Sequence, residues 1–345
     1  MPNPPLELRT VEALEAALAT PSARLIADMR RLEGDLLLLG AGGKMGPTLA
    51  MLARNALDAA GKRDQVIAVS RFGDAAARRR LEDAGVRTIA ADLMNDAELQ
   101  ALPDAANVIH MAAMKFGTSG SEHLTWAMNA YLPGRVGERY RGARIVAFSS
   151  GNVYPLVPLA STGATEDHPI EPIGEYGQSV LGRERIFAYG SHRYGTKVAA
   201  IRLNYAVDLR YGVLVDIATA VRDGDPLDLG MGHVNVVWQG YANEVTLRAL
   251  HHASSPPTAI NVTGPEIVSV RRVAHWFGER LGRAPVLVGE EQPSALLNDA
   301  SRCHALFGYP EITLLQMVDM VADWLRSGGE LLGRPTKFQV RSGRF

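Results

Sequence analysis

A glycine-rich segment in the first part of the chain has the composition of a phosphate-binding turn. It reads Gly40-Ala41-Gly42-Gly43-Lys44-Met45-Gly46 and lies between four consecutive leucines, residues 36–39, and a segment with helical periodicity. Glycines let the backbone approach a pyrophosphate, and the N–H groups that open the following helix supply partial positive charge. A strand, a glycine turn and a helix in this order predict dinucleotide binding, and the alternative is a purely structural tight turn. The predicted contacts are Gly40, Gly42, Gly43, Lys44, Met45 and Gly46.

Two later strand ends are candidates to hold the adenosine half of that dinucleotide. An acid at the end of the second strand would bind the ribose 2′-hydroxyl and favour NAD, but the sequence has Ser70-Arg71 there. Because Arg71 could pair with a 2′-phosphate, the sequence favours NADP over NAD. Asp92, followed by Leu93, comes after the third strand, where an acid could bind the adenine amino group.

An alternating α/β architecture is needed to bring these residues together. Apolar runs at residues 36–39, 65–69, 87–90, 107–111 and 144–148 alternate with helical patterns such as 47–60 and 75–84. Continuous apolar strands between helices are typical of a parallel sheet buried on both faces. The predicted fold is therefore α/β, a doubly wound parallel Rossmann sheet.

The rest of the chain is predicted to divide around this sheet. Residues 1–34 carry two amphipathic helical patterns, one through Leu14 and Leu18 and one through Leu25 and Met29, which predict a helical N-terminal extension. We expect a dinucleotide-binding Rossmann domain over residues 35–205, a small α/β substrate lobe interleaved with it over residues 206–327, and a solvated tail over residues 328–345.

Composition excludes several classes of protein. Lys and Arg number 36 against 37 Asp and Glu, so neither a nucleic-acid nor an anionic-membrane surface is expected. The longest aliphatic run, residues 36–39, is too short to span a bilayer, and no signal peptide is visible. Cys303 is the single cysteine, and no His and carboxylate set has metal-ligand spacing. We expect a cytoplasmic protein without a metal site.

Further segments follow the glycine turn in a characteristic order. They are His110-Met111-Ala112-Ala113, Ser149-Ser150-Gly151-Asn152-Val153-Tyr154, Tyr176-Gly177-Gln178-Ser179, Arg202-Leu203-Asn204-Tyr205 and Ile260-Asn261-Val262-Thr263-Gly264. Over about residues 35–327 the chain thereby resembles the extended short-chain dehydrogenase/reductase superfamily, in its nucleotide-sugar epimerase and dehydratase branch.

The resemblance implies a role for each matching residue. Tyr176 would exchange a proton with the substrate while hydride moves to or from the nicotinamide, and Ser150 would hold the substrate oxygen. The residues implied to lie beside the cofactor are Met111, Ala112, Ala113, Lys115, Asn129 and Tyr176 itself. The family also implies a homodimer through the helices that carry Asn129 and Tyr176.

The chain departs from the family pattern at one informative position. The family's tyrosine is followed four residues later by a lysine that lowers the phenol pKa, but here Val180 takes that place. Lys115, from another element, is the better candidate for a replacement cation in the catalytic site, and Lys44 is a second. Arg183 shares the helix face of Tyr176 within ~20° but lies ~10 Å along the axis, which is too far unless its side chain curls back.

Three functions stay open on these residues. The leading hypothesis is an NAD(P)-dependent oxidoreductase or epimerase acting on a carbohydrate-like hydroxyl or ketone of a sugar, sugar acid or nucleotide sugar. Val180 favours an NADP-binding sensor or scaffold without turnover, and a lyase or dehydratase using Tyr176 and His168 is the third hypothesis. The stretch from Asn204 to His233 is short and carries little basic charge, so a small carbohydrate is as plausible as a nucleotide sugar.

Overall fold

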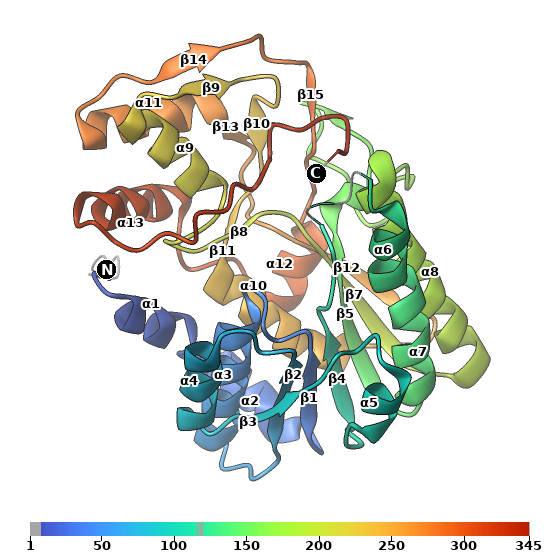
Figure 1. The fold of residues 1–345 in the computed structure, drawn as a ribbon. Coiled ribbons are helices and arrows are strands. Elements are labelled where there is room, and N and C mark those ends of the chain that lie inside the picture. The colour runs from blue at the N-terminus through green and yellow to red at the C-terminus, as the bar shows by residue number, and fades with distance from the viewer. Residues whose placement is uncertain (1–7, 116, 118–119, 345) are drawn as a thin grey trace.

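A seven-stranded parallel sheet forms the centre of the protein (Figure 1). We describe residues 8–115, 117 and 120–344 of the chain from a computed structural model. In spatial order the strands are β12 (Thr258–Val262), β7 (Lys197–Leu203), β5 (Arg144–Ser150), β4 (Asn107–His110), β1 (Leu36–Leu39), β2 (Val66–Ser70) and β3 (Arg87–Ala90), each parallel to its neighbours. The strand order reverses between β1 and β4. In such sheets, ligands bind beyond the carboxyl ends of the strands at that reversal.

Helices cover both faces of this sheet. One face carries α2 (Ala23–Arg31), α3 (Gly46–Ala59), α4 (Ala75–Asp83) and α10 (Gln239–Arg248), and the other carries α5 (Asp96–Ala101), α6 (Glu122–Trp126), η1 (Ala127–Tyr131), α7 (Leu132–Arg139) and α8 (Gly174–Tyr194). The leucines of β1 point alternately into the two layers, with Leu36 and Leu38 in one core and Leu37 and Leu39 in the other. This double burial is why the strand reads as an uninterrupted apolar run.

The predicted elements of the Rossmann half are confirmed. The run at residues 36–39 is β1, the helix expected at 47–60 is α3, and the strand expected at 144–148 is β5, which extends to Ser150. Their boundaries shift by at most two residues, because hydrophobic periodicity fixes the type of an element better than its ends. The doubly wound parallel sheet is confirmed with them.

A second lobe stands over the carboxyl ends of the strands. Its helices are α9 (Val213–Asp223), α11 (Val270–Leu281) and α13 (Leu314–Arg326). Short strand pairs join them: β9 (Pro226–Asp228) with β14 (Val286–Val288), β10 (His233–Val234) with β13 (Val268–Ser269), β8 (Ala206–Val207) with β11 (Val237–Trp238), and β6 (Val157–Pro158) with β15 (Ser294–Ala295). The chain returns to the sheet through η3 (Ala249–His252), β12 and α12 (Ser301–Phe307), while η2 (Gly151–Val153) continues β5. The lobe is therefore interleaved with the sheet.

The two ends of the described chain pack on this body rather than hanging from it. The predicted helical extension is present as α1 (Val11–Leu18) and α2, capped by the hydroxyls of Thr10 and Ser22, and both helices lie against α3 and α10. The prediction of a solvated C-terminal tail is wrong. Phe338 is fully buried, and Arg341 donates to the carbonyl of Ser294 at 2.6 Å. Polar sequence alone suggested solvation, but this segment crosses between the lobe and the sheet (Figure 1).

Candidate functional site

A cavity of about 650 Å³ lies where the strand order reverses, between the sheet and the lobe. The sequence-predicted residues that line it are Gly40, Gly42, Gly43, Lys44, Met45, Met111, Ala113, Lys115, Ser150 and Tyr176. They come from the glycine turn after β1, the segment after β4, the end of β5 and the first turn of α8. The fold therefore brings together the glycine turn and the catalytic residues implied by the family resemblance.

The outer glycines of the turn are required by close packing. Gly40 has a φ of +90°, and a side-chain carbon there would lie 2.6 Å from the backbone nitrogen of Ala112. A carbon on Gly46 would lie 2.2 Å from the carbonyl oxygen of Ala41. Gly46 also begins α3, whose N-terminus has no side-chain cap. The first N–H groups of α3 are thus available to an anion.

The two middle glycines differ from each other. A side-chain carbon on Gly42 would lie 2.3 Å from the Ser70 hydroxyl, so the turn packs directly on the end of β2. On Gly43 the same carbon would meet nothing closer than the Gly40 carbonyl at 3.8 Å. Gly43 lines the cavity. Its missing side chain therefore leaves room for a ligand and is not needed to fit the protein itself.

Tyr176 and Ser150 face each other in the cavity. The Ser150 side chain hydrogen-bonds Tyr176 and also accepts hydrogen bonds from the backbone and side-chain nitrogens of Asn152, at 3.2 and 2.9 Å. Burial raises the pKa of the Tyr176 phenol, while the charge of Arg183 and the bond to Ser150 act in the opposite direction. The phenol is therefore protonated at neutral pH and has a hydrogen-bonded partner and a cation beside it.

Arg183 supplies a buried cation on the helix that lacks the family's lysine. Its side chain does curl back: the guanidinium donates to the Phe148 carbonyl at 2.6 Å and to the Asn129 side-chain oxygen at 2.8 Å. Arg183 is 2% exposed and lines the cavity, and burial lowers its pKa to about 10, so it stays charged at neutral pH. Val180, at the lysine position, is buried in the hydrophobic core.

Asn129 positions the segment after β4 and does not line the cavity. Its side chain accepts from the Met114 N–H at 2.9 Å and donates to the Met114 carbonyl at 2.8 Å. It also donates to the Ser179 hydroxyl at 2.9 Å and, as noted, accepts from Arg183. Asn129 was predicted to lie beside the cofactor. In the structure its side chain instead links Met114, the residue before Lys115, to α8.

Two lysines with lowered pKa values lie in the cavity. The Lys115 ammonium lies 5.7 Å from the ring centre of Tyr176, and the Lys44 ammonium lies 3.0 Å from the ring centre of Tyr211. Burial lowers the pKa of Lys44 to about 7, repulsion from Lys115 and Arg334 adds to this, and Asp216 and Asp208 oppose it. Burial likewise lowers the pKa of Lys115 to about 8. An anionic ligand would relieve this repulsion.

The cavity has further lining residues that the sequence analysis did not assign, from α3, η2, the segments after β7 and β8, α10 and the C-terminal segment. They are Thr48, Asn152, Asn204, Tyr205, Arg210, Tyr211, Gln239, Leu332, Arg334 and Thr336. Tyr205 has a φ of 50°, a left-handed conformation that bulky residues rarely adopt and that is often found at functional sites. Asn204 and Tyr205 lie in a motif already noted, whereas nothing local marks the residues of the C-terminal segment.

The residues predicted to hold the adenosine half of a dinucleotide do not line the cavity. Ser70, Arg71, Asp92 and Leu93 are not among its lining residues, and neither are Gly46 and Ala112, which support the turn. Arg71 is exposed, and Asp92 accepts from the Met94 N–H at 2.9 Å. Asp74, Glu15 and Arg80, which were not predicted, do line the cavity. In the sequence, Asp74 is recognisable only as the residue that caps a helix. Glu15 is marked by no motif, because it comes from α1, far along the chain from the other cavity residues.

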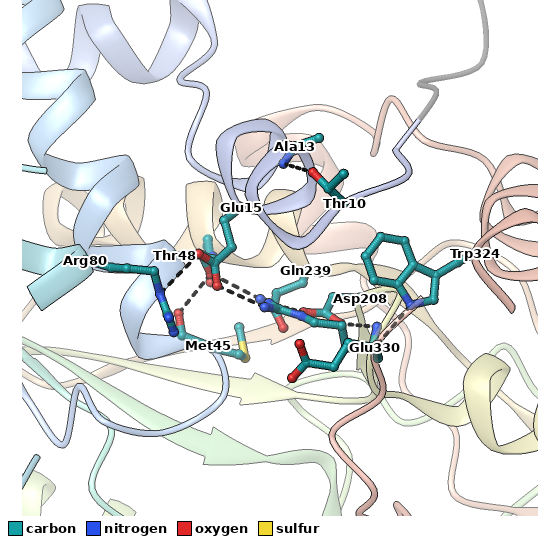
Figure 2. Close-up of polar contacts among 12 residues, drawn as sticks. Thr10, Ala13, Glu15, Met45, Thr48, Arg80, Asp208, Gln239, Trp324 and Glu330 are labelled. Atoms are coloured by element: carbon teal, nitrogen blue, oxygen red, sulfur yellow. Dashed lines mark hydrogen bonds and ion pairs between the residues drawn. The ribbon is translucent and has the colours of Figure 1, made fainter. Parts of the chain in front are cut away.

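Glu15 forms ion pairs with two arginines from different elements of the fold (Figure 2). Its carboxylate pairs with Arg80 of α4 at 3.6 Å and with Arg210 of the lobe at 2.9 Å. Arg210 also pairs with Asp208 at 2.8 Å, and its carbonyl accepts from the N–H of Leu332 in the C-terminal segment at 3.1 Å. Arg210 thus contacts both α1, through Glu15, and the C-terminal segment, through Leu332.

Other predicted features lie away from this site. His168 contacts the Pro169 carbonyl and the Tyr154 ring and does not line the cavity. Cys303 is buried, and burial raises its pKa to about 12. Across the described residues, no three His, Cys, Asp or Glu side chains are grouped to hold a metal ion. No helix in the described part of the chain is long and apolar enough to cross a bilayer.

Comparison with known proteins assigns the part of the chain that forms most of the sheet to a family. Residues 36–207 match the model of the NAD dependent epimerase/dehydratase family, and the chain belongs to that family through this segment. Among functionally curated proteins, no significant match was found.

Solved structures share the fold over most of the chain. UDP-glucose 4-epimerase from Thermotoga maritima, solved with UDP-glucose, is 15% identical with a TM-score of 0.70 over 85% of this chain and 99% of that chain. UDP-glucose 4-epimerase from Thermus thermophilus, in complex with NAD, is 21% identical with a TM-score of 0.68 over 85% and 99%. dTDP-glucose 4,6-dehydratase from Bacillus anthracis, also with NAD, is 16% identical with a TM-score of 0.71 over 85% and 97%.

Proposed function

We propose that this protein is an oxidoreductase or epimerase that uses a nicotinamide dinucleotide to act on a carbohydrate-like hydroxyl or ketone. One observation carries the proposal: Tyr176 is hydrogen-bonded to Ser150 beside the buried Arg183, in the same cavity as the glycine turn. The pair offers proton exchange, and the turn offers a pyrophosphate site. When bound, the nicotinamide would supply the hydride chemistry.

Each residue of the site has a role in this proposal. The glycine turn and the start of α3 hold the pyrophosphate through backbone N–H groups, and Lys44, within the turn, adds positive charge to the same cavity. Tyr176 gives a proton to, or takes one from, the substrate oxygen, and Ser150 orients that oxygen. Arg183 takes part of the electrostatic role of the missing lysine by favouring the phenolate. Lys115 adds positive charge near Tyr176.

The substrate class rests on the family and on the charge of the cavity. The similar structures named above were solved as nucleotide-sugar epimerases and a dehydratase. The positive cavity, with Lys115 and Arg334 in its lining, suits a sugar that carries a carboxylate or phosphate. We therefore propose a sugar acid, a sugar phosphate or a nucleotide sugar as substrate.

A cytoplasmic homodimer belongs to the same proposal. Large apolar side chains are exposed on and near the two helical elements that carry Asn129 and Tyr176: Leu124 is 50% exposed, Tyr131 60% and Ile173 37%. Grouped apolar surface of this kind is typical of a protein interface. Light scattering of the purified protein tests it, and a monomer at micromolar concentration would contradict it.

Two observations count against the alternative functions, a sensor or scaffold and a lyase or dehydratase. A sensor or scaffold without turnover was favoured by Val180, but Arg183 brings a cation to Tyr176 by another route. A lyase that uses His168 would need that imidazole in the cavity, and it lies outside the lining. We therefore retain the oxidoreductase or epimerase as the proposed function.

The test has a binding step and a turnover step. Purified protein is analysed for nucleotide released on denaturation and titrated with NADH and NADPH by fluorescence. It is then incubated with sugars, sugar acids and nucleotide sugars, and both reduced nicotinamide and product are measured. Tyr176→Phe should abolish turnover and keep binding, whereas Tyr189→Phe, exposed on the same helix, should keep both. Failure to bind either nucleotide would overturn the proposal, and full turnover by Tyr176→Phe would overturn the assigned role.

A further inference from the structure

Charged residues that the sequence analysis did not assign line the cavity near the end of β2. The contact between Gly42 and Ser70 fixes where the glycine turn meets the end of β2, which is where a dinucleotide places its adenosine ribose. Among the charged residues that line the cavity, Asp74 follows the end of β2 by four residues, Arg80 lies on the helix that Asp74 caps, and Glu15 pairs with Arg80. We infer that Asp74 and Glu15 select NAD over NADP. This inference rests on the proposed dinucleotide-dependent function.

Asp74 is held in place by the helix that it caps. One carboxylate oxygen, Oδ1, accepts from the N–H groups of Ala76 and Ala77 at 2.8 and 3.2 Å. The hydrogen bonds described for Asp74 do not use Oδ2. A carboxylate accepts several hydrogen bonds and donates none, so Asp74 can receive a ribose hydroxyl without giving up the cap. It lies four residues beyond Ser70, where the sequence pattern would have placed the acid.

Glu15 brings a second negative charge from a distant part of the chain. Its side chain is only 12% exposed and is fixed by two guanidinium groups, those of Arg210 and Arg80. Because α1 packs against α3, Glu15 reaches the cavity beside the start of that helix. The matched family segment begins at residue 36, so this acid is supplied from outside it.

The arginines near Asp74 and Glu15 already form ion pairs with acidic side chains. Arg80 pairs with Glu15, and Arg210 is shared between Glu15 and Asp208. Arg78, on the same helix as Arg80, pairs with Glu82 at 2.9 Å. Arg71, the residue that suggested NADP, is exposed and absent from the cavity lining.

The balance of charge therefore disfavours a 2′-phosphate. Such a group brings a charge of about −1.5 to −2 toward Asp74 and Glu15. Arg80 would have to leave Glu15 to compensate. A ribose with two free hydroxyls instead offers donors that both carboxylates accept, and it adds no charge.

The experiment is a pair of fluorescence titrations, with NADH and with NADPH, on the full chain at low salt. The wild type should bind NADH about five- to tenfold more tightly, as expected for repulsion of about one unit charge near a hydrated rim. Asp74→Asn keeps the helix cap, because asparagine caps as well as aspartate, and should reduce the preference. Glu15→Gln should reduce it too, and the double variant should remove it. Arg71→Ala is the control and should leave the ratio unchanged.

Thermal unfolding of each variant checks that the fold is kept. If Glu15→Gln is unstable through loss of its ion pairs, Asp74→Asn carries the test alone. Tighter binding of NADPH by the wild type, or an unchanged ratio in Asp74→Asn, overturns the inference and leaves the proposed function standing. Binding of neither nucleotide overturns both, so the two failures are distinguishable.

Discussion

Alanine at Gly43 and alanine at Gly46 should have opposite consequences, although the two glycines are only three residues apart. At Gly43 the new carbon would meet nothing within the protein closer than 3.8 Å, which is ordinary contact, and this glycine is not in a left-handed conformation. The free energy of unfolding should change by no more than about 0.5 kcal/mol, as at an ordinary surface site. The carbon would instead occupy the space that we assign to the pyrophosphate.

The loss of affinity can be bounded. If the added carbon breaks one hydrogen bond between a backbone N–H and a charged phosphate, the cost is about 1.5–3 kcal/mol, or roughly 10- to 150-fold in Kd. At Gly46 the carbon would lie 2.2 Å from the Ala41 carbonyl oxygen, and backbone cannot move aside cheaply. Overpacking of this kind costs about 1–3 kcal/mol or more, so Gly46→Ala should lower stability directly.

Urea unfolding and NADH titration of both variants and the wild type separate the two effects. Gly43→Ala should unfold with the wild type and bind weakly, while Gly46→Ala should unfold at lower urea. Wild-type affinity in Gly43→Ala would refute the assignment of the turn as the pyrophosphate site. An equal loss of stability in both variants would refute the view that only Gly46 is fixed by packing.

Three further predictions follow from individual side chains. Dinucleotide affinity should fall as pH rises through about 7, the pKa of Lys44, because an anion prefers the protonated ammonium. Lys44→Met should flatten this pH profile of the affinity. A flat profile in the wild type would contradict the prediction. Arg183→Met should shift the tyrosine limb of the pH–rate profile to higher pH, since the cation that lowers the Tyr176 pKa is gone, and an unshifted limb would count against this role. Phe338→Ala should destabilise by about 3–5 kcal/mol in urea unfolding, as a buried aromatic does; a change under about 1 kcal/mol would mean that the C-terminal segment is not part of the core.

Much of the fold could be predicted from local patterns. The four leucines of β1 indicated a strand buried on both faces, and the structure places them alternately in two cores. The glycine turn between that strand and α3 was equally readable, because its backbone requirements are local. Ser150 and Tyr176 were found through the family resemblance, and the parallel sheet then brings the end of β5 and the start of α8 together.

The positions of the charged side chains in the site could not be predicted from local patterns. Spacing along α8 placed Arg183 two turns from Tyr176, and only the acceptors offered by Phe148 and Asn129 explain why its side chain turns back. From the sequence, Asp74 is recognisable only as a helix cap, and its place in the cavity lining depends on how α4 packs against α3.

The sequence by itself determined the strands, the turn and the loss of the family's lysine, because each is marked by residues within one short stretch. Only the tertiary structure decided that Glu15 from the first helix and Arg334 from the last segment line the cavity, and that Phe338 is core. Those placements depend on packing between segments hundreds of residues apart. Hydrophobic periodicity and motif spacing carry no record of such contacts, since a polar or basic residue looks the same in sequence whether water or a binding site surrounds it.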